Sequence, residues 1–257
     1  PPLPFTTSTL QQEASKRLNM STQKTMRLAQ ELYEGVTLKG KGSVGLITYL
    51  RTDSTRISEE ADASCREYIA QQYGEQFVGD KTAVKSSKTG KIQDAHEAIR
   101  PTYVDLSPTM VKEALSRDHF RLYQLIWTRF LASRMAEAVY ETTSVKIGAG
   151  DYRFNVAASK VKFDGFMTVY SYDSEKSTMN AAMKKITKDT EITLSGLDPQ
   201  QHFTQPPAHF TEASLVKTLE ELGIGRPSTY APTITTLLAR RYIVKESKNL
   251  YITELGE

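Results

Sequence analysis

Three side chains with complementary chemistry lie close together in the sequence: Tyr49, Arg51 and Asp53. They belong to a short apolar run, residues 45–50, and the polar residues after it, and the β-branched and aromatic side chains of that run favour an extended backbone. Residues i and i+2 of an extended segment point the same way, so Tyr49 and Arg51 are expected on one face, with Asp53 beside them. A phenol next to a permanent cation can bind a phosphate and, once ionised, attack it. The alternative is a core strand in which the tyrosine packs and the arginine is solvated.

A second group of polar side chains, His96, Glu97 and Arg100, lies just before Pro101. Histidine changes its charge near neutral pH and therefore serves in proton transfer. The stretch before this group, residues 79–95, is polar and lysine-rich without periodicity, and we expect it to be a loop. The group indicates either a phosphate-binding or acid–base role or a structural one, and the residues themselves leave both open.

A glycine-rich turn near the end of the chain is a third candidate site. Residues 223–231 carry Arg226, Ser228 and Thr229, between a helix that Thr211 is expected to cap and a second helix that reaches Arg240. Free backbone N–H groups and the helix dipole favour an anion at such a helix start. With an expected hairpin after it, the pattern resembles a winged helix, for which DNA contact and a purely structural role both stay open.

The elements expected to position these residues are mainly helical in the first half of the chain. A capping box at residues 8–11 begins the first helix. A second helix runs to Tyr33 and places Gln30 and Glu34 on one face, because they are four residues apart. The glycine-rich stretch at 35–43 departs from a nucleotide-binding loop at its last positions, so a basic hairpin is expected there.

Two further helices and a sheet follow. Ser58 is expected to cap a helix that ends at Gly74, and Asp118 to cap a long helix through about residue 138. From residue 141 the apolar residues alternate with a period of two, which predicts an antiparallel sheet. Ile192 and Leu194 are expected to extend that sheet. The fold class predicted from these patterns is α+β.

Composition narrows the class of protein. The chain has 257 residues, 39% hydrophobic and 25% charged, which is typical of a soluble globular protein. A net charge of +3 is too small to indicate nucleic acid binding by itself. The single cysteine, Cys65, cannot form an internal disulfide and lies on the apolar face of its expected helix. No apolar run approaches the roughly 20 residues of a membrane span, and both ends are expected to be cuts in a longer protein.

Four stretches of this sequence resemble, in order, the bacterial type IA DNA topoisomerases. Gly45-Leu-Ile-Thr-Tyr-Leu-Arg-Thr-Asp-Ser54 resembles their nucleophile motif, and His96-Glu-Ala-Ile-Arg-Pro-Thr102 their histidine motif. The stretches 210–217 and 223–231 resemble the signature near the end of their catalytic core, and residues 4–12 fit the segment before the nucleophile. The resemblance covers nearly the whole chain and favours a catalytic Tyr49 over a packed one.

The resemblance implies a multidomain α+β arrangement. Residues 1–139 would form a mainly helical gate domain that carries the nucleophilic tyrosine. Residues 140–205 would form a β-rich arch or hinge segment, and residues 206–257 a winged-helix-like part of the base domain.

The resemblance also implies roles for individual residues. Tyr49 would attack a phosphodiester of single-stranded DNA and hold its 5′ end as a phosphotyrosine, with Arg51 gripping the scissile phosphate. Asp53 and His96 would form a supporting pair. Other positions would lie around the nucleophile or the bound strand, with Arg100 the weaker candidate for DNA contact: Gln30, Glu34, Thr48, Thr52, Arg100, Arg226, Ser228, Thr229 and Arg240.

The family pattern further implies partners outside this sequence. Members carry a TOPRIM domain that binds Mg²⁺ and assists cleavage, and this chain has no such domain, so no metal ligand is expected here and the isolated chain is expected to be inactive. The implied substrate is a single-stranded segment of negatively supercoiled DNA, met by a monomer in the bacterial cytoplasm at the nucleoid, with no membrane partner. Two alternatives are a DNA-binding module without catalysis, and a phosphotyrosine-signalling or recombinase-like protein. The arginines and histidines that surround the nucleophile of tyrosine recombinases are not found here.

Overall fold

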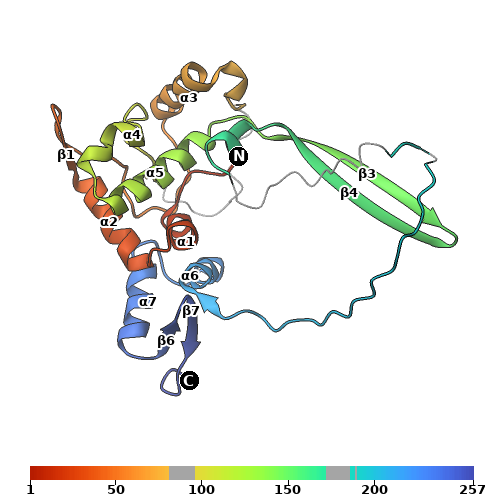
Figure 1. The fold of residues 1–257 in the computed structure, drawn as a ribbon. Helices are drawn as coiled ribbons and strands as arrows, with labels where there is room; N and C mark the ends of the chain where they lie inside the picture. Colours follow the sequence, from red (N-terminus) through yellow and green to blue (C-terminus); the bar gives the residue numbers. More distant parts are fainter. Residues whose placement is uncertain (81–95, 172–185, 189) are drawn as a thin grey trace.

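The fold is that of a computed structural model, which describes residues 1–80, 96–171, 186–188 and 190–257 (Figure 1). It combines helices with antiparallel sheets, so the α+β prediction is confirmed. The expected loop at residues 79–95 falls almost entirely outside the described residues. None of the helices in the described ranges has the length and apolar composition that a membrane span requires.

The first part of the chain is a helical body. Its elements are α1 (Thr7–Leu18), α2 (Thr22–Glu34), the hairpin of β1 (Val36–Leu38) and β2 (Gly42–Val44), α3 (Glu59–Tyr73), the short helix η1 (Glu75–Phe77), α4 (Pro108–Val111), η3 (Lys112–Ala114) and α5 (Arg117–Ala132). One face of α5 is buried and packs on α1 and α2. Two aromatic residues of α5 satisfy their polar atoms inside this core, because the Tyr123 hydroxyl donates to the Leu106 carbonyl (2.6 Å) and the Trp127 indole N–H to that of Val104 (2.9 Å).

Two helix starts differ from the sequence prediction. Thr6, with an extended backbone, is the N-cap of α1 and forms the capping box with Thr9, so the box predicted two residues later is wrong. Ser116 rather than Asp118 caps α5, which also ends before residue 138. Both segments contain several residues that can cap a helix, and the extended backbone of the actual cap decides between them.

A long two-stranded hairpin extends away from the helical body (Figure 1). It pairs β3 (Val139–Ala149) with β4 (Tyr152–Phe163) through a turn at Gly150, whose φ of +60° favours glycine. The predicted extension by Ile192 and Leu194 is wrong: both lie outside any strand and are 49% and 72% exposed. Two apolar positions among polar neighbours are too few to bury a strand face.

The base of this hairpin is fixed to the helical body. After β4, the short helix η4 (Gly165–Thr168) turns back, and a Cβ at Gly165 would lie 2.5 Å from the Ala136 carbonyl oxygen. Tyr170, which is 2% exposed, donates its hydroxyl to Glu13 (3.0 Å) and accepts from Arg129 (3.2 Å). The chain therefore returns to the first core before it reaches the last segment.

The last segment folds around a small apolar cluster of its own, built on Val216, Tyr230 and Ile234. It contains β5 (Phe210–Thr211), α6 (Glu212–Glu221), α7 (Tyr230–Ala239), β6 (Ile243–Glu246) and β7 (Asn249–Ile252), with strand order β5-β7-β6. Thr211 caps α6 as predicted, and the predicted hairpin is formed by β6 and β7. In Figure 1, α6 lies beside α1 and α7 beside α2. The domain boundaries at 139/140 and 205/206 stay a prediction.

Candidate active site

The segment that carries Tyr49 alternates between exposed and buried side chains. Tyr49, Arg51 and Asp53 are exposed, whereas the residues between and after them are buried: Leu50, Thr52 and Ser54. All three candidate residues therefore face outward, while the residues between them pack inward. The segment is not a regular strand, because its one bridge joins Ile47 to Pro101.

Backbone and side-chain hydrogen bonds hold this segment against residues 98–102. The Thr48 N–H donates to the Arg100 carbonyl (2.9 Å), and the Thr48 hydroxyl donates to the Ala98 carbonyl (2.7 Å). The same hydroxyl accepts from the Arg100 N–H (3.0 Å). Thr48 was expected near the nucleophile or the DNA, and its hydroxyl is occupied in joining the two motif segments.

Helix α1 supports the other side of the segment. The Thr7 hydroxyl donates to the Leu50 carbonyl (2.7 Å) and accepts from the Thr52 N–H (2.9 Å). Thr52 is only 2% exposed, and its hydroxyl accepts from the Ser54 N–H (3.1 Å). The expected contact between Thr52 and DNA is therefore not available in this conformation, because the alternation that exposes Arg51 turns its neighbour inward.

The Tyr49 ring lies between two other rings and is 39% exposed. Its centroid is 5.4 Å from that of His96, with the planes tilted by 30°, and 5.6 Å from that of Tyr33 in an edge-to-face arrangement. Tyr33 comes from the end of α2, which can approach closely because residue 45 is a glycine. A Cβ at Gly45 would lie 2.7 Å from the Tyr33 carbonyl oxygen. The structure thus brings His96 to the phenol and adds Tyr33.

Asp53 and His96 were expected to form a pair, and the structure does not join them. No hydrogen bond or ion pair links their side chains within the described part of the chain. Asp53 instead lies within electrostatic reach of α7: burial raises the pKa of the Tyr230 phenol, and the carboxylates of Glu220 and Asp53 add to that rise. Asp53 is thus in electrostatic contact with the last segment, whereas Tyr49 is the residue in ring contact with His96.

Arg100 is occupied by its own motif. Its guanidinium donates to one carboxylate oxygen of Glu97 (2.8 and 2.5 Å) and to the Pro101 carbonyl (3.0 Å). Both charged side chains are largely covered, at 12% and 18% exposure. Arg100 therefore fixes the shape of the His96 loop. This structural role accounts for Arg100 without any contact to DNA.

Gln30 and Glu34 share a face of α2, as predicted. The Gln30 amide donates to the Glu34 carboxylate (2.6 Å). Tyr33 lies on the same end of the helix, one turn from Gln30, and is 40% exposed. Tyr33 is three residues from Gln30, a spacing that indicates a shared helix face. The aromatic ring of Tyr33 instead favoured a place in the core.

The glycine turn offers fewer free donors than expected. Gly225 has φ +81°, and the Thr229 and Tyr230 N–H groups both donate to the Arg226 carbonyl (2.9 and 3.3 Å). Pro232 in the first turn of α7 has no N–H to donate. The Thr229 hydroxyl accepts from the Arg226 N–H (2.8 Å). The expected anion site at the backbone is thus largely closed, and exposed side chains remain as the means of contact: Arg226, Ser228, Thr229 and Arg240.

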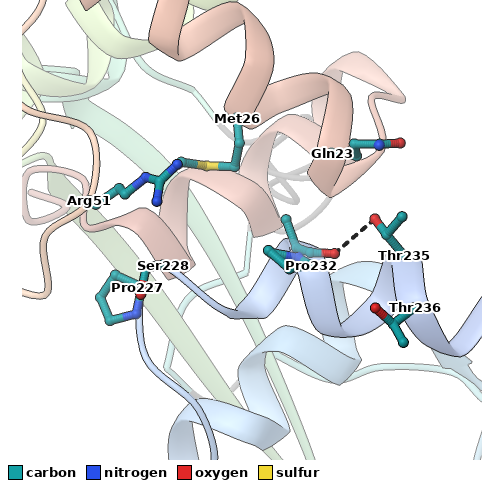
Figure 2. A pocket seen from close by; sticks show the side chains of 9 residues that line it. Gln23, Met26, Arg51, Pro227, Ser228, Pro232, Thr235 and Thr236 are labelled. Atoms are coloured by element: carbon teal, nitrogen blue, oxygen red, sulfur yellow. Dashed lines mark hydrogen bonds between the residues drawn. The ribbon is translucent and has the colours of Figure 1, made fainter.

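A pocket of about 360 Å³ connects the tyrosine segment with the last segment (Figure 2). Arg51 lies on one side with Gln23 and Met26 of α2, and the turn and α7 supply the other wall: Pro227, Ser228, Ala231, Pro232, Thr235 and Thr236. Figure 2 shows the side chains of Arg51 and Met26 at one end of the pocket and those of Thr235 and Thr236 toward the other. Two expected site residues, Arg51 and Ser228, are therefore neighbours across this junction.

Comparison with known proteins matches this arrangement to one family. Residues 1–257 match the family model described as DNA topoisomerase. This chain belongs to the bacterial DNA topoisomerase family. A solved structure of full-length topoisomerase I from Thermotoga maritima is 40% identical, with a TM-score of 0.78. The match covers 100% of this chain and 41% of that protein, so this topoisomerase chain spans less than half of its relative's length.

Whether this topoisomerase chain can hold a metal ion depends on how its metal-ligating side chains are grouped. Within the described residues, no three or more His, Cys, Asp or Glu side chains gather closely enough to hold a metal ion. The residues around Tyr49 therefore do not fit a magnesium site by themselves. The nearest titratable neighbour with a defined contact to the phenol is His96.

Proposed function

We propose that this chain is the tyrosine-bearing part of a type IA DNA topoisomerase, which relaxes negative supercoils by cutting one strand, passing the other and rejoining the first. The observation that carries the proposal is the position of Tyr49. Its ring is exposed, lies beside His96, and is two residues from the exposed Arg51.

The proposed reaction is a transesterification. The Tyr49 oxygen attacks the phosphorus of one phosphodiester, the bond from phosphorus to the 3′ oxygen breaks, and a bond from phosphorus to the tyrosine oxygen forms. The phenol proton leaves, and the released 3′ oxygen gains a proton. One phosphodiester replaces another of similar energy, so the reversal by the 3′ hydroxyl requires no ATP.

The neighbouring residues supply what this step needs. Phenols ionise near pH 10 in water, so attack at neutral pH requires a route for the proton and positive charge near the phosphate. Arg51 provides a permanent charge that binds a phosphate through a planar, bidentate group. His96 is the imidazole in ring contact with Tyr49, and we assign to it proton transfer or orientation of the phenol.

The exposed residues of the last segment extend the site along a strand. Ser228 shares the pocket with Arg51, and Arg240 lies one turn of α7 beyond Thr236, which also lines it. Together with Arg226 and Thr229 these side chains form a polar track for the phosphates of a single strand. Gln30 and Glu34 lie near the end of α2 that carries Tyr33, whose ring contacts Tyr49.

Mg²⁺ and the TOPRIM domain are proposed as further requirements. We propose that a TOPRIM domain of the same polypeptide holds the metal, because the described residues offer no site for it. On this proposal the isolated chain is inactive, and the whole enzyme is a monomer that acts at the nucleoid in the bacterial cytoplasm.

The test is covalent capture of a single-stranded oligonucleotide by the full-length enzyme. Tyr49→Phe removes the attacking oxygen and is expected to abolish capture. Tyr33→Phe is the matched control, because Tyr33 is equally exposed and in ring contact with Tyr49, and it is expected to retain capture. Capture that survives Tyr49→Phe would overturn the assignment.

A DNA-binding module without catalysis is the second candidate, favoured by the exposed polar track at residues 226–240. Supplying the TOPRIM domain as a separate protein with Mg²⁺ distinguishes the two. The topoisomerase is expected to gain relaxation of negatively supercoiled DNA, whereas a binding module would gain none.

A further inference from the structure

A buried carboxylate joins the helical body to the last segment. Glu212, the first residue of α6, is 4% exposed. One of its oxygens accepts from the N–H and the hydroxyl of Thr22 (2.7 and 2.9 Å), and the other accepts from the Lys245 ammonium (2.6 Å). A single side chain therefore connects α2, α6 and β6.

The bond to Thr22 completes a helix start. Thr22 is the first residue of α2, where backbone N–H groups lack partners inside the helix. The α2 N-cap, Ser21, accepts from the Lys24 N–H, so Glu212 supplies a second acceptor from another part of the chain. A negative charge is favourable at this end of a helix. Burial opposes the charge, but Lys245 and Thr22 outweigh burial and lower the pKa of Glu212.

A second polar contact lies at the other end of α6. The Ser8 hydroxyl of α1 donates to the Glu220 carboxylate (2.7 Å), and Gln12 donates to Ser8 (3.0 Å). We call the contact of α1 and α2 with α6 and α7 the seam. The seam also contains the pocket between Arg51 and Ser228. It is thus held by hydrogen bonds at both ends of α6 and is incompletely filled beside α7.

The two sides of the seam have separate apolar cores. The core of the helical body contains residues up to Tyr170, and the last segment has its own cluster around Val216. If the seam opens, each side keeps its core, and the polar groups exchange their partners for water.

Opening of the seam would serve strand passage, so this inference rests on the proposed function. Tyr49 lies on one side of the seam and the turn with Ser228 on the other. After cleavage, the 5′ end is bound to Tyr49, and a second strand needs a gap in the protein beside the cut, which parting of the two sides helps to open. We propose that Glu212, with Thr22 and Lys245, is the latch that holds the seam closed during cleavage and releases it for strand passage.

The experiment follows single full-length enzymes on single-stranded DNA under tension in Mg²⁺ buffer, where each opening of the cut strand appears as a step in DNA extension. Glu212→Gln keeps the shape of the side chain but removes the charge that Lys245 needs. It is expected to raise the opening rate about tenfold at a given force, while covalent capture stays within about twofold of wild type. Thr22→Val removes one hydroxyl and keeps the N–H, so a smaller increase is expected.

Glu221→Gln is the matched control. Glu221 is on the same helix, but it faces solvent and pairs with Lys217 of α6 itself. The opening rate of this variant is therefore expected to match wild type. An unchanged opening rate in both Glu212→Gln and Thr22→Val would overturn the latch, and so would loss of capture in Glu212→Gln alone, which would make Glu212 a support of the active site. Failure of the wild-type enzyme to capture DNA would instead contradict the proposed function.

Discussion

The rings of Tyr49 and His96 lie 5.4 Å apart, centroid to centroid, although the two residues belong to segments distant in the sequence. Thr48 is the reason for this closeness. Its hydroxyl donates to Ala98 and accepts from the Arg100 N–H, which fastens the histidine loop to the tyrosine segment.

Thr48→Val tests this fastening. The substitution keeps the shape but leaves the Arg100 N–H without its partner, so the free energy of unfolding is expected to fall by about 1–3 kcal/mol. Covalent capture by the full-length enzyme is expected to slow, because His96 is held less firmly. Thr55→Val is the control, since no hydrogen bond of the Thr55 hydroxyl occurs within the described residues. Equal capture rates in the two variants would contradict the role of Thr48.

Much of this site could be predicted from local patterns. The period of two that exposes Tyr49, Arg51 and Asp53 depends only on neighbouring residues, and so does the shared face of Gln30 and Glu34. The contact of His96 with Tyr49 depends on pairing between distant segments, which no local pattern contains.

Other features could not be predicted because they depend on distant packing. Glu212 was not singled out in the sequence, and only the folded chain places Thr22 and Lys245 around it. Asp53 and His96 were expected to pair, but Asp53 lies within electrostatic reach of Tyr230 in α7 instead. The start of α1 was predicted at Ser8 rather than Thr6, because both residues can cap a helix and only the extended backbone at Thr6 distinguishes them.

Acid is expected to weaken the link made by Glu212. The pKa of Glu212 is held below its ordinary value of 4.5, because Lys245 and Thr22 outweigh the effect of burial. The stability from this shift is fully present above pH 4.5 and is lost as the pH falls through the lower folded-state pKa. Urea unfolding of wild type and Glu212→Gln should therefore show a stability difference at pH 7 that shrinks below pH 4.5. A difference that does not change with pH would contradict the charged state of Glu212.

Gln11 is expected to lower stability. Both polar atoms of its side chain are buried in α1 without a hydrogen-bond partner among the described residues. Gln11→Met removes the unsatisfied amide at similar length, so the free energy of unfolding is expected to rise by about 1–2 kcal/mol. Gln12→Met, which breaks the bond to Ser8, serves as the control and should not stabilise. Thermal unfolding of both variants measures this, and a loss of stability in Gln11→Met would contradict it.

Cys65 is expected to be unreactive in the folded chain. Burial raises the pKa of its thiol to about 12, so at pH 8 only about one thiol in ten thousand is ionised. Iodoacetamide should label the chain only after unfolding in urea. Labelling of the folded chain at the rate of a free thiol would show that the α3 face is not packed as the structure has it.

The residue that bonds to DNA can be identified directly by mass spectrometry. The full-length enzyme is trapped on a single-stranded oligonucleotide with Mg²⁺, and the complex is digested with nuclease and trypsin. Cleavage after Lys41 and Arg51 releases residues 42–51, in which Tyr49 is the only tyrosine. The nucleotide is predicted on this peptide, linked through its 5′ phosphate. A nucleotide on residues 28–39, which carry Tyr33, or a linkage through the 3′ phosphate would contradict the assignment of Tyr49.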